Sequence, residues 1–451
     1  MKDSEIEWFG KIPEHWNEPS VSRLKQMLII LDFQDGNHGE LHPKVDDFTD
    51  TGKPFLTAEQ IDEFGNIDFD NANRLPEEFC KKLRIGFSYA NDILFTHNAT
   101  VGRVAIMPPN APDSIIGTSI TYYRLDVERL NQIFFSFLMN SDYISSQYEP
   151  IMKQTTRNQF SILKQAKLKI LLPNIDEQKN IADFLIDKTK KIDNEVLKNI
   201  KLIEFLKEKH QVMINNAVIK GIDPNVTMKN SGIEWIGNIP EHWKISRLKY
   251  VVKDMIAGPF GSSIKKEYYV KKGYKVYGQE QVISDDFTIG DYYISEEKFY
   301  ELKRFEIKTD DILISCVGTL GQISVVPKSA EPGIINPRLI KLTPNSKICN
   351  SNYVYQYLKS HAAFSQFEKY GRGGTMDIIN QTIIGLILLP LPPIDEQHII
   401  SHYIIGIKHK FNNLLTTVET QIEKLRECRQ SLISSAVSGK IDIRETQSII
   451  Q

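Results

Sequence analysis

The sequence lacks the features that usually assign a chain to a catalytic or structural class. It has four widely separated cysteines and no Cys-x-x-Cys pair, so neither a zinc knuckle nor a disulfide framework is indicated. It has no run of about 18 uncharged apolar residues and no apolar signal core after Met1, which predicts a soluble, cytoplasmic protein without a membrane span. The formal net charge of −2 excludes a uniformly basic surface but not a local basic face.

Several catalytic motifs are also missing. The chain contains no G-x-x-x-x-G-K-[ST] loop, no G-x-S-x-G elbow and no H-E-x-x-H pair. The glycine-rich cofactor loop and the Asn- or Asp-Pro-Pro-aromatic segment of a base methyltransferase are absent too. These absences argue against an ATP-driven motor, a serine hydrolase, a zinc protease and a methyltransferase. We therefore expect a chain that is not an enzyme and binds no cofactor or metal itself.

What the sequence does contain is a long internal repeat. The segment Glu7 to Trp16 returns as Glu234 to Trp243, with eight of ten positions identical. Leu172-Pro173-Asn174-Ile175-Asp176-Glu177-Gln178 returns as Leu391-Pro392-Pro393-Ile394-Asp395-Glu396-Gln397. Repeats more than 200 residues apart are too long for a solenoid, so each copy is predicted to have its own core.

Each copy reads as a mixed α+β globe followed by a long helix. Short β-rich runs occur at Asp92 to Phe95 and Ser119 to Tyr123, and again at Asp311 to Ser315 and Leu339 to Leu342. Amphipathic stretches at Gln132 to Tyr143 and Tyr353 to Phe367 predict helices packed on the sheets.

The long helices are marked by apolar residues at spacings of three and four. From Asp176 to Val218 the sequence has no proline or glycine, and a second stretch with the same apolar spacing ends near Gly439. Two such stripes predict that the helices pack on each other in antiparallel fashion, with one globe at each end. The residues predicted to lie on these stripes are Ile192, Val196, Ile203, Leu206, Phe411, Leu414, Val418, Ile422 and Leu425.

Candidate DNA contacts cluster before the helices and in amide-rich loops. Arg, Lys, Asn and Gln can pair with base edges, whereas Thr and glycine N–H groups suit phosphate oxygens. The candidates are Arg103, Lys153, Gln154, Thr155, Thr156, Arg157, Asn158, Gln159, Lys265, Lys266, Gln279, Gln281, Arg372, Gly373, Gly374 and Thr375.

One other group of residues keeps a catalytic alternative open. Asp291 with Glu306-Ile307-Lys308 has the residue order of a metal-dependent nuclease, although the first copy has Phe87-Ser88-Tyr89 in the corresponding place. His15 and His242 lie beside repeated tryptophans without a second ligand at metal spacing, which favours a structural use.

The combination of motifs resembles the specificity subunit of type I restriction-modification systems. The likeness rests on two copies of E-W-x-G-x-I-P-x-H-W, two Asp-Ile-Leu segments and two L-P-x-x-x-E-Q segments, and it covers essentially the whole chain. It implies an α+β fold, with two duplicated target-recognition domains separated by two long antiparallel coiled-coil helices. The implied boundaries are 1–173 for the first domain, 174–222 for the central spacer helix, 223–391 for the second domain with a linker at 223–230, and 392–451 for the C-terminal spacer helix and tail.

The resemblance also implies a division of labour. A subunit of this kind recognises a bipartite sequence in double-stranded DNA without being catalytic. Its two long helices, which here carry the stripe residues named above, form the spacer and dock other subunits. DNA methyltransferase subunits and motor-nuclease subunits act as its partners, and S-adenosylmethionine, ATP and magnesium are bound by those partners. Two alternatives stay open at this point: a metal-dependent endonuclease, and a coiled-coil scaffold without DNA contact.

Overall fold

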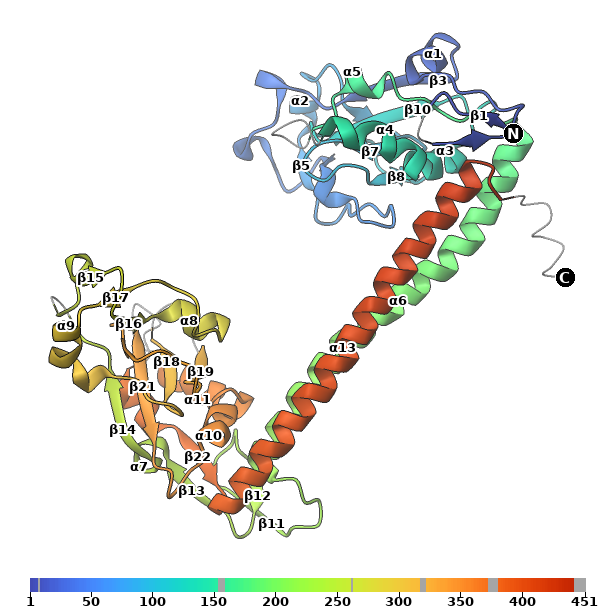
Figure 1. Ribbon diagram of the computed structural model, residues 1–451. Coiled ribbons are helices and arrows are strands. Elements are labelled where there is room, and N and C mark those ends of the chain that lie inside the picture. Colours follow the sequence, from blue (N-terminus) through green and yellow to red (C-terminus); the bar gives the residue numbers. More distant parts are fainter. Residues whose placement is uncertain (7–8, 153–158, 261–262, 317–321, 372–379, 442–451) are drawn as a thin grey trace. The chain divides into compact units, whose positions relative to one another are not determined.

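The computed structural model describes residues 1–6, 9–152, 159–260, 263–316, 322–371 and 380–441 (Figure 1). The chain divides into two compact units. The first consists of Met1–Ile200 with Glu419–Gln451, and the second of Lys201–Val418. Each unit therefore contains one globular domain and parts of both long helices, α6 (Ile175–Lys220) and α13 (Ile394–Val437).

The first domain is built on two four-stranded sheets. One is antiparallel, with the order β3 (Ile30–Asp35), β10 (Ile120–Leu125), β7 (Ile93–Thr96), β8 (Val104–Ile106). The other is mixed, with the order β5 (Asn73–Leu75), β4 (Lys53–Leu56), β9 (Ser114–Ile116), β6 (Phe87–Ser88), and β4 runs parallel to β9. The remaining elements are β1 (Lys2–Asp3), β2 (Lys11–Ile12), α1 (Val21–Gln26), α2 (Glu77–Cys80), α3 (Gln132–Met139), α4 (Asp142–Met152) and α5 (Ile162–Gln165).

The second domain repeats this plan. Its antiparallel sheet has the order β14 (Val252–Ala257), β21 (Leu339–Pro344), β18 (Ile312–Ser315), β19 (Ile323–Val325). Its mixed sheet has the order β15 (Tyr269–Val270), β17 (Tyr293–Ile294), β16 (Tyr274–Tyr277), β20 (Gly333–Ile335), and β16 runs parallel to β20. Beside these lie β11 (Met228–Asn230), β12 (Asn238–Pro240), β13 (Lys244–Arg247), β22 (Leu388–Leu391), α7 (Leu248–Val251), α8 (Gln279–Ser284), α9 (Glu296–Glu301), α10 (Ser351–Leu358), α11 (His361–Gly371) and α12 (Gln381–Leu386).

The repeated Asp-Ile-Leu segments are strands whose two faces are both buried. In β7, Ile93 and Phe95 belong to the core that faces the helices, whereas Leu94 points into a second cluster on the other face of the sheet. Strand β18 divides in the same way, with Leu313 on the face opposite Ile312. Because side chains alternate along a strand, a sheet covered on both faces requires continuous apolar runs of this kind.

The amphipathic stretches predicted as single helices each form two. Gln132 to Tyr143 is divided between α3 and α4 at Ser141, whose hydroxyl donates to the carbonyl of Leu138 at 2.6 Å. In the second copy the break lies at Ser360, whose Oγ accepts the N–H of Ala363 at 3.4 Å. Serine hydroxyls satisfy backbone groups that a helix end leaves unpaired, so both segments turn at these positions.

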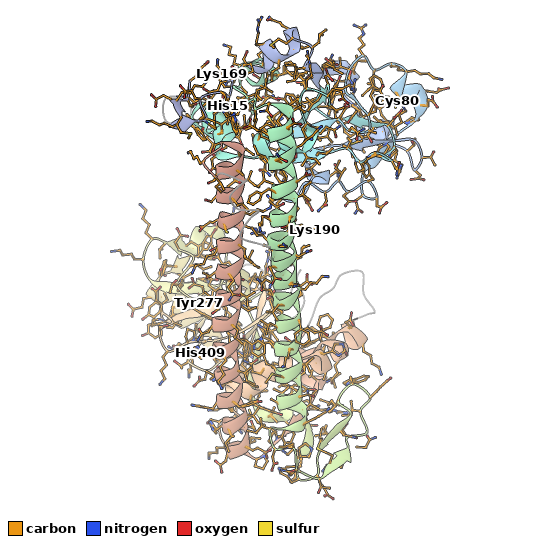
Figure 2. The ribbon with its side chains drawn as sticks, turned by 90° about the vertical axis from the view of Figure 1, so that its right-hand side faces the viewer. His15, Cys80, Lys169, Lys190, Tyr277 and His409 are labelled. Atoms are coloured by element: carbon orange, nitrogen blue, oxygen red, sulfur yellow. The ribbon has the colours of Figure 1, made fainter. Side chains whose placement is uncertain are left out.

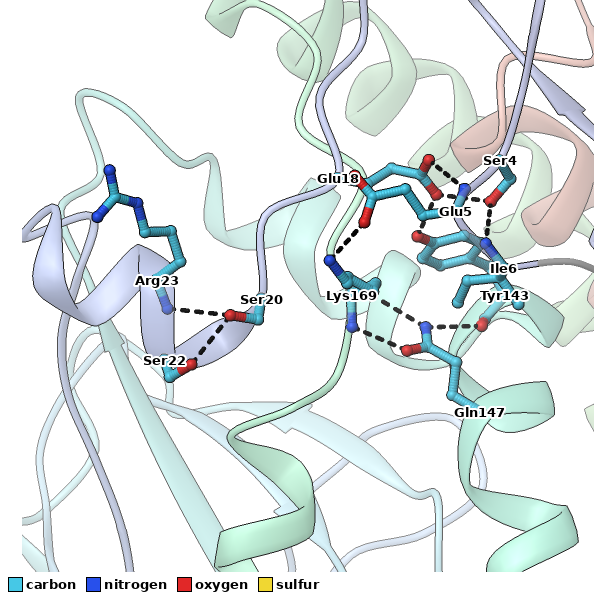
Figure 3. A network of polar contacts seen from close by, with 10 residues as sticks. All are labelled: Ser4, Glu5, Ile6, Glu18, Ser20, Ser22, Arg23, Tyr143, Gln147 and Lys169. Carbon is cyan, nitrogen blue, oxygen red and sulfur yellow. Dashed lines mark hydrogen bonds and ion pairs between the residues drawn. The ribbon is translucent and has the colours of Figure 1, made fainter.

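The N-terminal segment of the first domain is held by a buried carboxylate, Glu18 (Figure 3). Ser4 Oγ and the hydroxyl of Tyr143 donate to Glu18 Oε1 at 2.6 and 2.7 Å, and the N–H of Glu5 donates to Oε2 at 2.8 Å. Lys169 forms an ion pair with Glu5 nearby. Burial raises the pKa of Tyr143, and the hydrogen bond to Glu18 adds to that shift.

The two long helices run antiparallel. In the first unit, the N-terminal part of α6 meets the C-terminal part of α13, where Arg429 Nε donates to Asp193 Oδ1 at 2.7 Å. In the second unit, the C-terminal part of α6 meets the N-terminal part of α13, and the rings of His210 and Phe411 have centroids 4.8 Å apart. Figure 2 shows the helices side by side, with exposed Lys190 on α6 and His409 on α13. The predicted helix pairing is confirmed.

Candidate functional site

In both domains, the two sheets meet at a shared set of backbone hydrogen bonds, which we call the frame. In the first domain, the N–H of Gly117 donates to the carbonyl of Leu56 at 2.7 Å, and the N–H of His97 donates to the carbonyl of Ser119 at 2.9 Å. In the second domain, the same bonds join Asn336 to Tyr277 at 2.8 Å and Cys316 to Arg338 at 2.9 Å. Each residue that forms a frame bond in the first domain therefore has one equivalent residue in the second domain.

The repeated aspartates of the Asp-Ile-Leu segments hold the turn that leads into β7 in one domain and into β18 in the other. Asp92 Oδ2 accepts the N–H of Tyr89 at 2.9 Å, and Asp311 Oδ2 accepts the N–H of Lys308 at 2.8 Å. Both aspartates are about 1% exposed. Burial raises the pKa of Asp311, against the lowering effect of its hydrogen bond with Thr343. Their repetition is therefore explained by a turn that both domains need.

On the frame of the second domain, polar side chains converge at the ends of β16 and β18 and at the turn between β20 and β21. Gln279 Nε2 donates to Ser315 Oγ at 2.6 Å, and Arg338 Nη1 donates to Gln279 Oε1 at 3.4 Å. Gln279 and Arg338 line a pocket of about 290 Å³, together with Asn336 and the rings of Tyr269 and Tyr292. This pocket offers donors, acceptors and aromatic surface together.

The first domain has small side chains at the paired positions. Ala58, Thr96 and Ser119 correspond to Gln279, Ser315 and Arg338. Ser119 Oγ accepts the N–H of Ala58 at 3.0 Å, and Thr96 Oγ1 accepts the N–H of Arg103 at 2.9 Å. The same frame therefore carries different chemical groups in the two domains.

A buried histidine follows β7 in the first domain. His97 is fully buried, and neither of its ring nitrogens has a hydrogen-bond partner among the described residues. Burial lowers the pKa of His97, with Asp35 acting in the opposite direction. The paired residue in the second domain is Cys316, where burial raises the pKa of the thiol to about 12.

Several predicted contact residues lie at or near the frame. Gln159 forms an isolated β-bridge with Asn98, two residues after β7. Lys265 and Lys266 are exposed and precede Tyr269 of the pocket, and Lys265 pairs weakly with Glu267 at 3.5 Å. Gln279 lines the pocket itself. The predicted contacts Lys153, Gln154, Thr155, Thr156, Arg157, Asn158, Arg372, Gly373, Gly374 and Thr375 lie outside the described residues.

Two predicted contacts are used inside the fold instead. Gln281 is fully buried; its Oε1 accepts the N–H of Gly278 at 2.7 Å, and its Nε2 donates to the carbonyl of Ile289 at 3.0 Å. Gln60 accepts the N–H of Thr57 at 3.0 Å in the same way in the first domain. We therefore correct the assignment of Gln281 to a structural one.

Arg103 has a similar internal use. Its Nη1 donates to the carbonyl of Ile61 at 2.6 Å, and its side chain is only half-buried. The Arg103 side chain thus stabilises the loop that follows β4. This structural role explains the arginine without a contact to DNA.

Sequence reasoning missed Arg338, which lies in the turn before β21. A lone arginine next to proline carries no recognisable pattern. Aligning the two copies through the Asp-Ile-Leu segments would have placed Arg338 opposite Ser119, and this difference between paired positions is the available signal.

The helix residues divide into packed and exposed positions. Val196 is fully buried, and Phe411, Val418 and Ile422 are nearly so. The remaining predicted positions on the inner face, Ile192, Ile203, Leu206 and Leu425, are half-buried. Leu414 is 49% exposed, and the half-buried Leu415 takes its place on the inner face. The prediction that Leu414 packs between the helices is wrong, because a spacing of four, from Phe411 to Leu415, meets the partner helix here.

The nuclease alternative finds no support in the geometry. The carboxylate of Glu306 pairs with Lys303 at 2.7 Å, and Lys308 occupies the turn position of Tyr89. Across the part of the chain that the structure describes, no group of three or more His, Cys, Asp or Glu side chains is arranged to hold a metal ion. Within the same described residues, no helix is both long enough and apolar enough to cross a membrane.

Curated relatives are similar to parts of the chain. It is 24% identical over 282 residues to the type I restriction enzyme MjaVIII specificity subunit of Methanocaldococcus jannaschii, covering 61% of this chain and 63% of that protein. The type I restriction enzyme EcoBI specificity subunit of Escherichia coli is 21% identical over 275 residues, covering 60% and 58%. The chain thus spans less than two thirds of the length of these relatives.

Solved structures are similar over nearly the whole fold. A chain from a structural study of complex assembly and conformational transition of the type I R-M system has a TM-score of 0.68 at 17% identity, covering 96% of this chain and all of that one. The HsdS subunit from Thermoanaerobacter tengcongensis has a TM-score of 0.52 at 17% identity, covering 98% and 100%. At this identity the likeness concerns the fold, and the predicted fold class is confirmed.

The family is shown by a match to both copies. The family described as type I restriction modification DNA specificity domain matches residues 21–204 and 240–424. These two segments cover most of the chain and repeat its internal duplication. The chain belongs to the family of type I restriction modification DNA specificity domains and carries two copies of that domain.

Proposed function

We propose that this protein is the DNA-sequence-recognition subunit of a type I restriction-modification complex, in which each domain reads one half of a bipartite target in double-stranded DNA. The observation that carries the proposal is the duplicated frame, which holds Gln279 and Arg338 in one domain and Ala58 and Ser119 in the other. Two copies of one scaffold with different side chains at matching positions suit two different base sequences.

The long helices would then act as a spacer. One base-reading domain gains only about 1 to 3 kcal/mol per well-paired base contact. Linking two domains through a stiff connection makes the second contact intramolecular and selects one separation between half-sites.

The helices would also dock DNA methyltransferase subunits. Apolar side chains on the two helices remain exposed, including Phe205 at 58%, Val212 at 48% and Leu414 at 49%. Phe205 and Val212 are seven positions apart and so share one face of α6, and an apolar face left exposed on a helix is typical of protein–protein contact. Methyl transfer from S-adenosylmethionine, and ATP- and magnesium-dependent cleavage by motor-nuclease subunits, would be carried out by these partners in the cytoplasm, and the chain itself would be non-catalytic.

The test is to map methylated adenines across the genome in cells that express the chain with its methyltransferase subunit, and in cells that lack the chain. We expect one bipartite motif, two short defined sequences separated by a fixed number of undefined bases, that disappears without the chain. An unchanged methylation pattern would contradict the proposal. Binding of the methyltransferase subunit without sequence-selective DNA affinity in the assembled complex would instead identify a scaffold.

A further inference from the structure

We infer that Gln279 and Arg338 are specificity-determining residues that read base edges in the half-site of the second domain, and that Ala58 and Ser119 occupy the matching positions in the first. This inference rests on the proposed function and identifies the side chains that carry it. Gln pairs through its amide with the N6 and N7 atoms of adenine, and Arg pairs with O6 and N7 of guanine.

The internal duplication separates a recognition role from a folding role. With Ala58 and Ser119, the first domain forms the same frame bonds, Gly117 to Leu56 and His97 to Ser119, as the second domain does with larger side chains. The Gln279 and Arg338 side chains are therefore not needed to build the turn. By contrast, Gln60 and Gln281 accept the same backbone N–H in both domains, as expected of residues kept for the fold.

The Gln279 amide is oriented before any ligand arrives. Its Nε2 is directed at Ser315 Oγ by a 2.6 Å hydrogen bond, whereas its Oε1 faces the Arg338 guanidinium at 3.4 Å. The second distance is long for a hydrogen bond, so little is lost when a base edge replaces that contact. An amide held in one orientation binds its target at a smaller entropic cost.

Exposure and surroundings suit a base edge. Arg338 is exposed and Gln279 half-buried, at the rim of the pocket of about 290 Å³. The rings of Tyr269 and Tyr292 have centroids 5.1 Å apart on its wall. Phe260, 75% exposed, follows Gly258, which packs against the backbone of Asn336 so closely that a Cβ would lie 1.9 Å from its carbonyl oxygen. Aromatic surface beside amide and guanidinium groups is a usual setting for nucleobase contact.

One acidic group shares this rim. Glu280 is exposed, and its Oε1 accepts a hydrogen bond from Gln281 Nε2 at 3.0 Å. Its charge opposes the approach of a phosphate group, whereas a base edge with an exocyclic amine is compatible with it. The neighbourhood therefore favours contact in a groove over contact with the backbone.

The experiment replaces each residue by its counterpart from the other domain. Gln279→Ala and Arg338→Ser, expressed with the methyltransferase subunit, should each fold with a cooperative melting transition, and Gln279→Ala loses its hydrogen bond to Ser315 Oγ. Adenine methylation mapping should then show relaxed preference at one or two positions of a single half-site. Each lost bidentate contact corresponds to roughly a 5- to 150-fold loss of discrimination. The other half-site and the spacer should stay unchanged.

Two further variants make the test independent of stability. Arg304→Ser removes an exposed arginine of the same domain that does not line the pocket, and it should leave the motif unaltered. The reciprocal pair, Ala58→Gln with Ser119→Arg, should change the opposite half-site. An unaltered motif in folded Gln279→Ala and Arg338→Ser proteins would overturn the inference, and so would an equal change caused by Arg304→Ser. Failure of the proposed function looks different, because the parent protein would then produce no bipartite motif at all.

Discussion

His15 Nε2 lies 2.9 Å from Glu177 Oε1, which joins the first repeated motif of the chain to the start of α6. The second copy forms the same contact, with His242 Nε2 at 2.8 Å from Glu396 Oε2 at the start of α13. Residues 162 and 154 positions apart are thus brought together twice. This contact explains why the His-Trp motif and the Glu-Gln motif both recur, because in each domain the histidine binds the glutamate at the start of the long helix that follows.

The His15–Glu177 pair should contribute only modestly to stability. The side chains are 61% and 31% exposed, and exposed pairs contribute about 0.2 to 1 kcal/mol. We expect a double-mutant cycle with His15→Ala and Glu177→Ala, measured by urea unfolding, to give a coupling energy in this range that shrinks at high salt. The His242–Glu396 cycle serves as an internal comparison. A coupling above about 2 kcal/mol, or one insensitive to salt, would contradict this assignment.

The end of α13 should tolerate no side chain at Gly439. This glycine has φ +67°, and a Cβ would lie 2.4 Å from Cγ of Pro13 in the first repeated motif. Gly439→Ala is therefore expected to cost about 1 to 2 kcal/mol for the left-handed backbone and about 1 to 3 kcal/mol more for overpacking. Urea denaturation measures the sum of these two costs as a loss in the free energy of unfolding.

Gly232→Ala is the matched control for that substitution. Gly232 has φ +73°, and nothing lies within 4 Å of its built Cβ, so only the backbone cost should appear. Equal losses in the two variants would show that α13 does not pack against Pro13 as described.

Acid should destabilise the first domain through His97. Because burial lowers the pKa of His97 in the folded protein, the unfolded chain binds the proton more readily. The associated stability is present above the unfolded pKa of about 6.5 and is lost as pH falls below it, by at most about 1.4 kcal/mol per pH unit.

His97→Cys, which introduces the residue of the paired position, should flatten this dependence. Burial also lowers the pKa of His210, which both proteins share, so the difference between their unfolding profiles from pH 7.5 to 5.5 isolates His97. Parallel profiles for the two proteins would refute the effect.

Shortening both helices together should shorten the recognised spacer. The contact of Asp193 with Arg429 in the first unit and that of His210 with Phe411 in the second bracket one heptad on each helix, residues 197–203 of α6 and residues 418–424 of α13. Deleting both segments removes about 10 Å of helix and preserves the heptad phase. With DNA rising about 3.4 Å per base pair, methylation mapping should show a motif about three base pairs shorter in its undefined part.

Deleting residues 197–203 alone provides the contrast. With only α6 shortened, the contacts of Asp193 with Arg429 and of His210 with Phe411 cannot both form, and sequence-specific methylation should be lost. An unaltered spacer after the paired deletion would mean that the helices do not set the distance between half-sites.

The elements of the fold could be predicted where they depend on neighbours in the sequence. The stretch without proline or glycine predicted the helix that runs over Ile175–Lys220, and the apolar runs around Ile93 and Ile312 predicted the buried strands β7 and β18. The candidate DNA-contact residues were harder to predict from the sequence. Gln279 and Gln281 are two residues apart in one amide-rich stretch that forms α8, yet Gln279 lines a pocket, whereas Gln281 is buried and accepts the N–H of Gly278.

The amino-acid sequence by itself determined the duplication, the strands and the two long helices, because periodicity and turn residues act over a few positions along the chain. Only the tertiary structure decided that Ile433, Ala436 and Val437 of α13 join the core around Trp16, while Ile214, Ala217 and Val218 of α6 join the core around Trp243. It also decided that Leu415, and not Leu414, faces the partner helix. Such choices depend on packing between segments distant in sequence, and apolar residues of similar size carry no local signal of which partner they will meet.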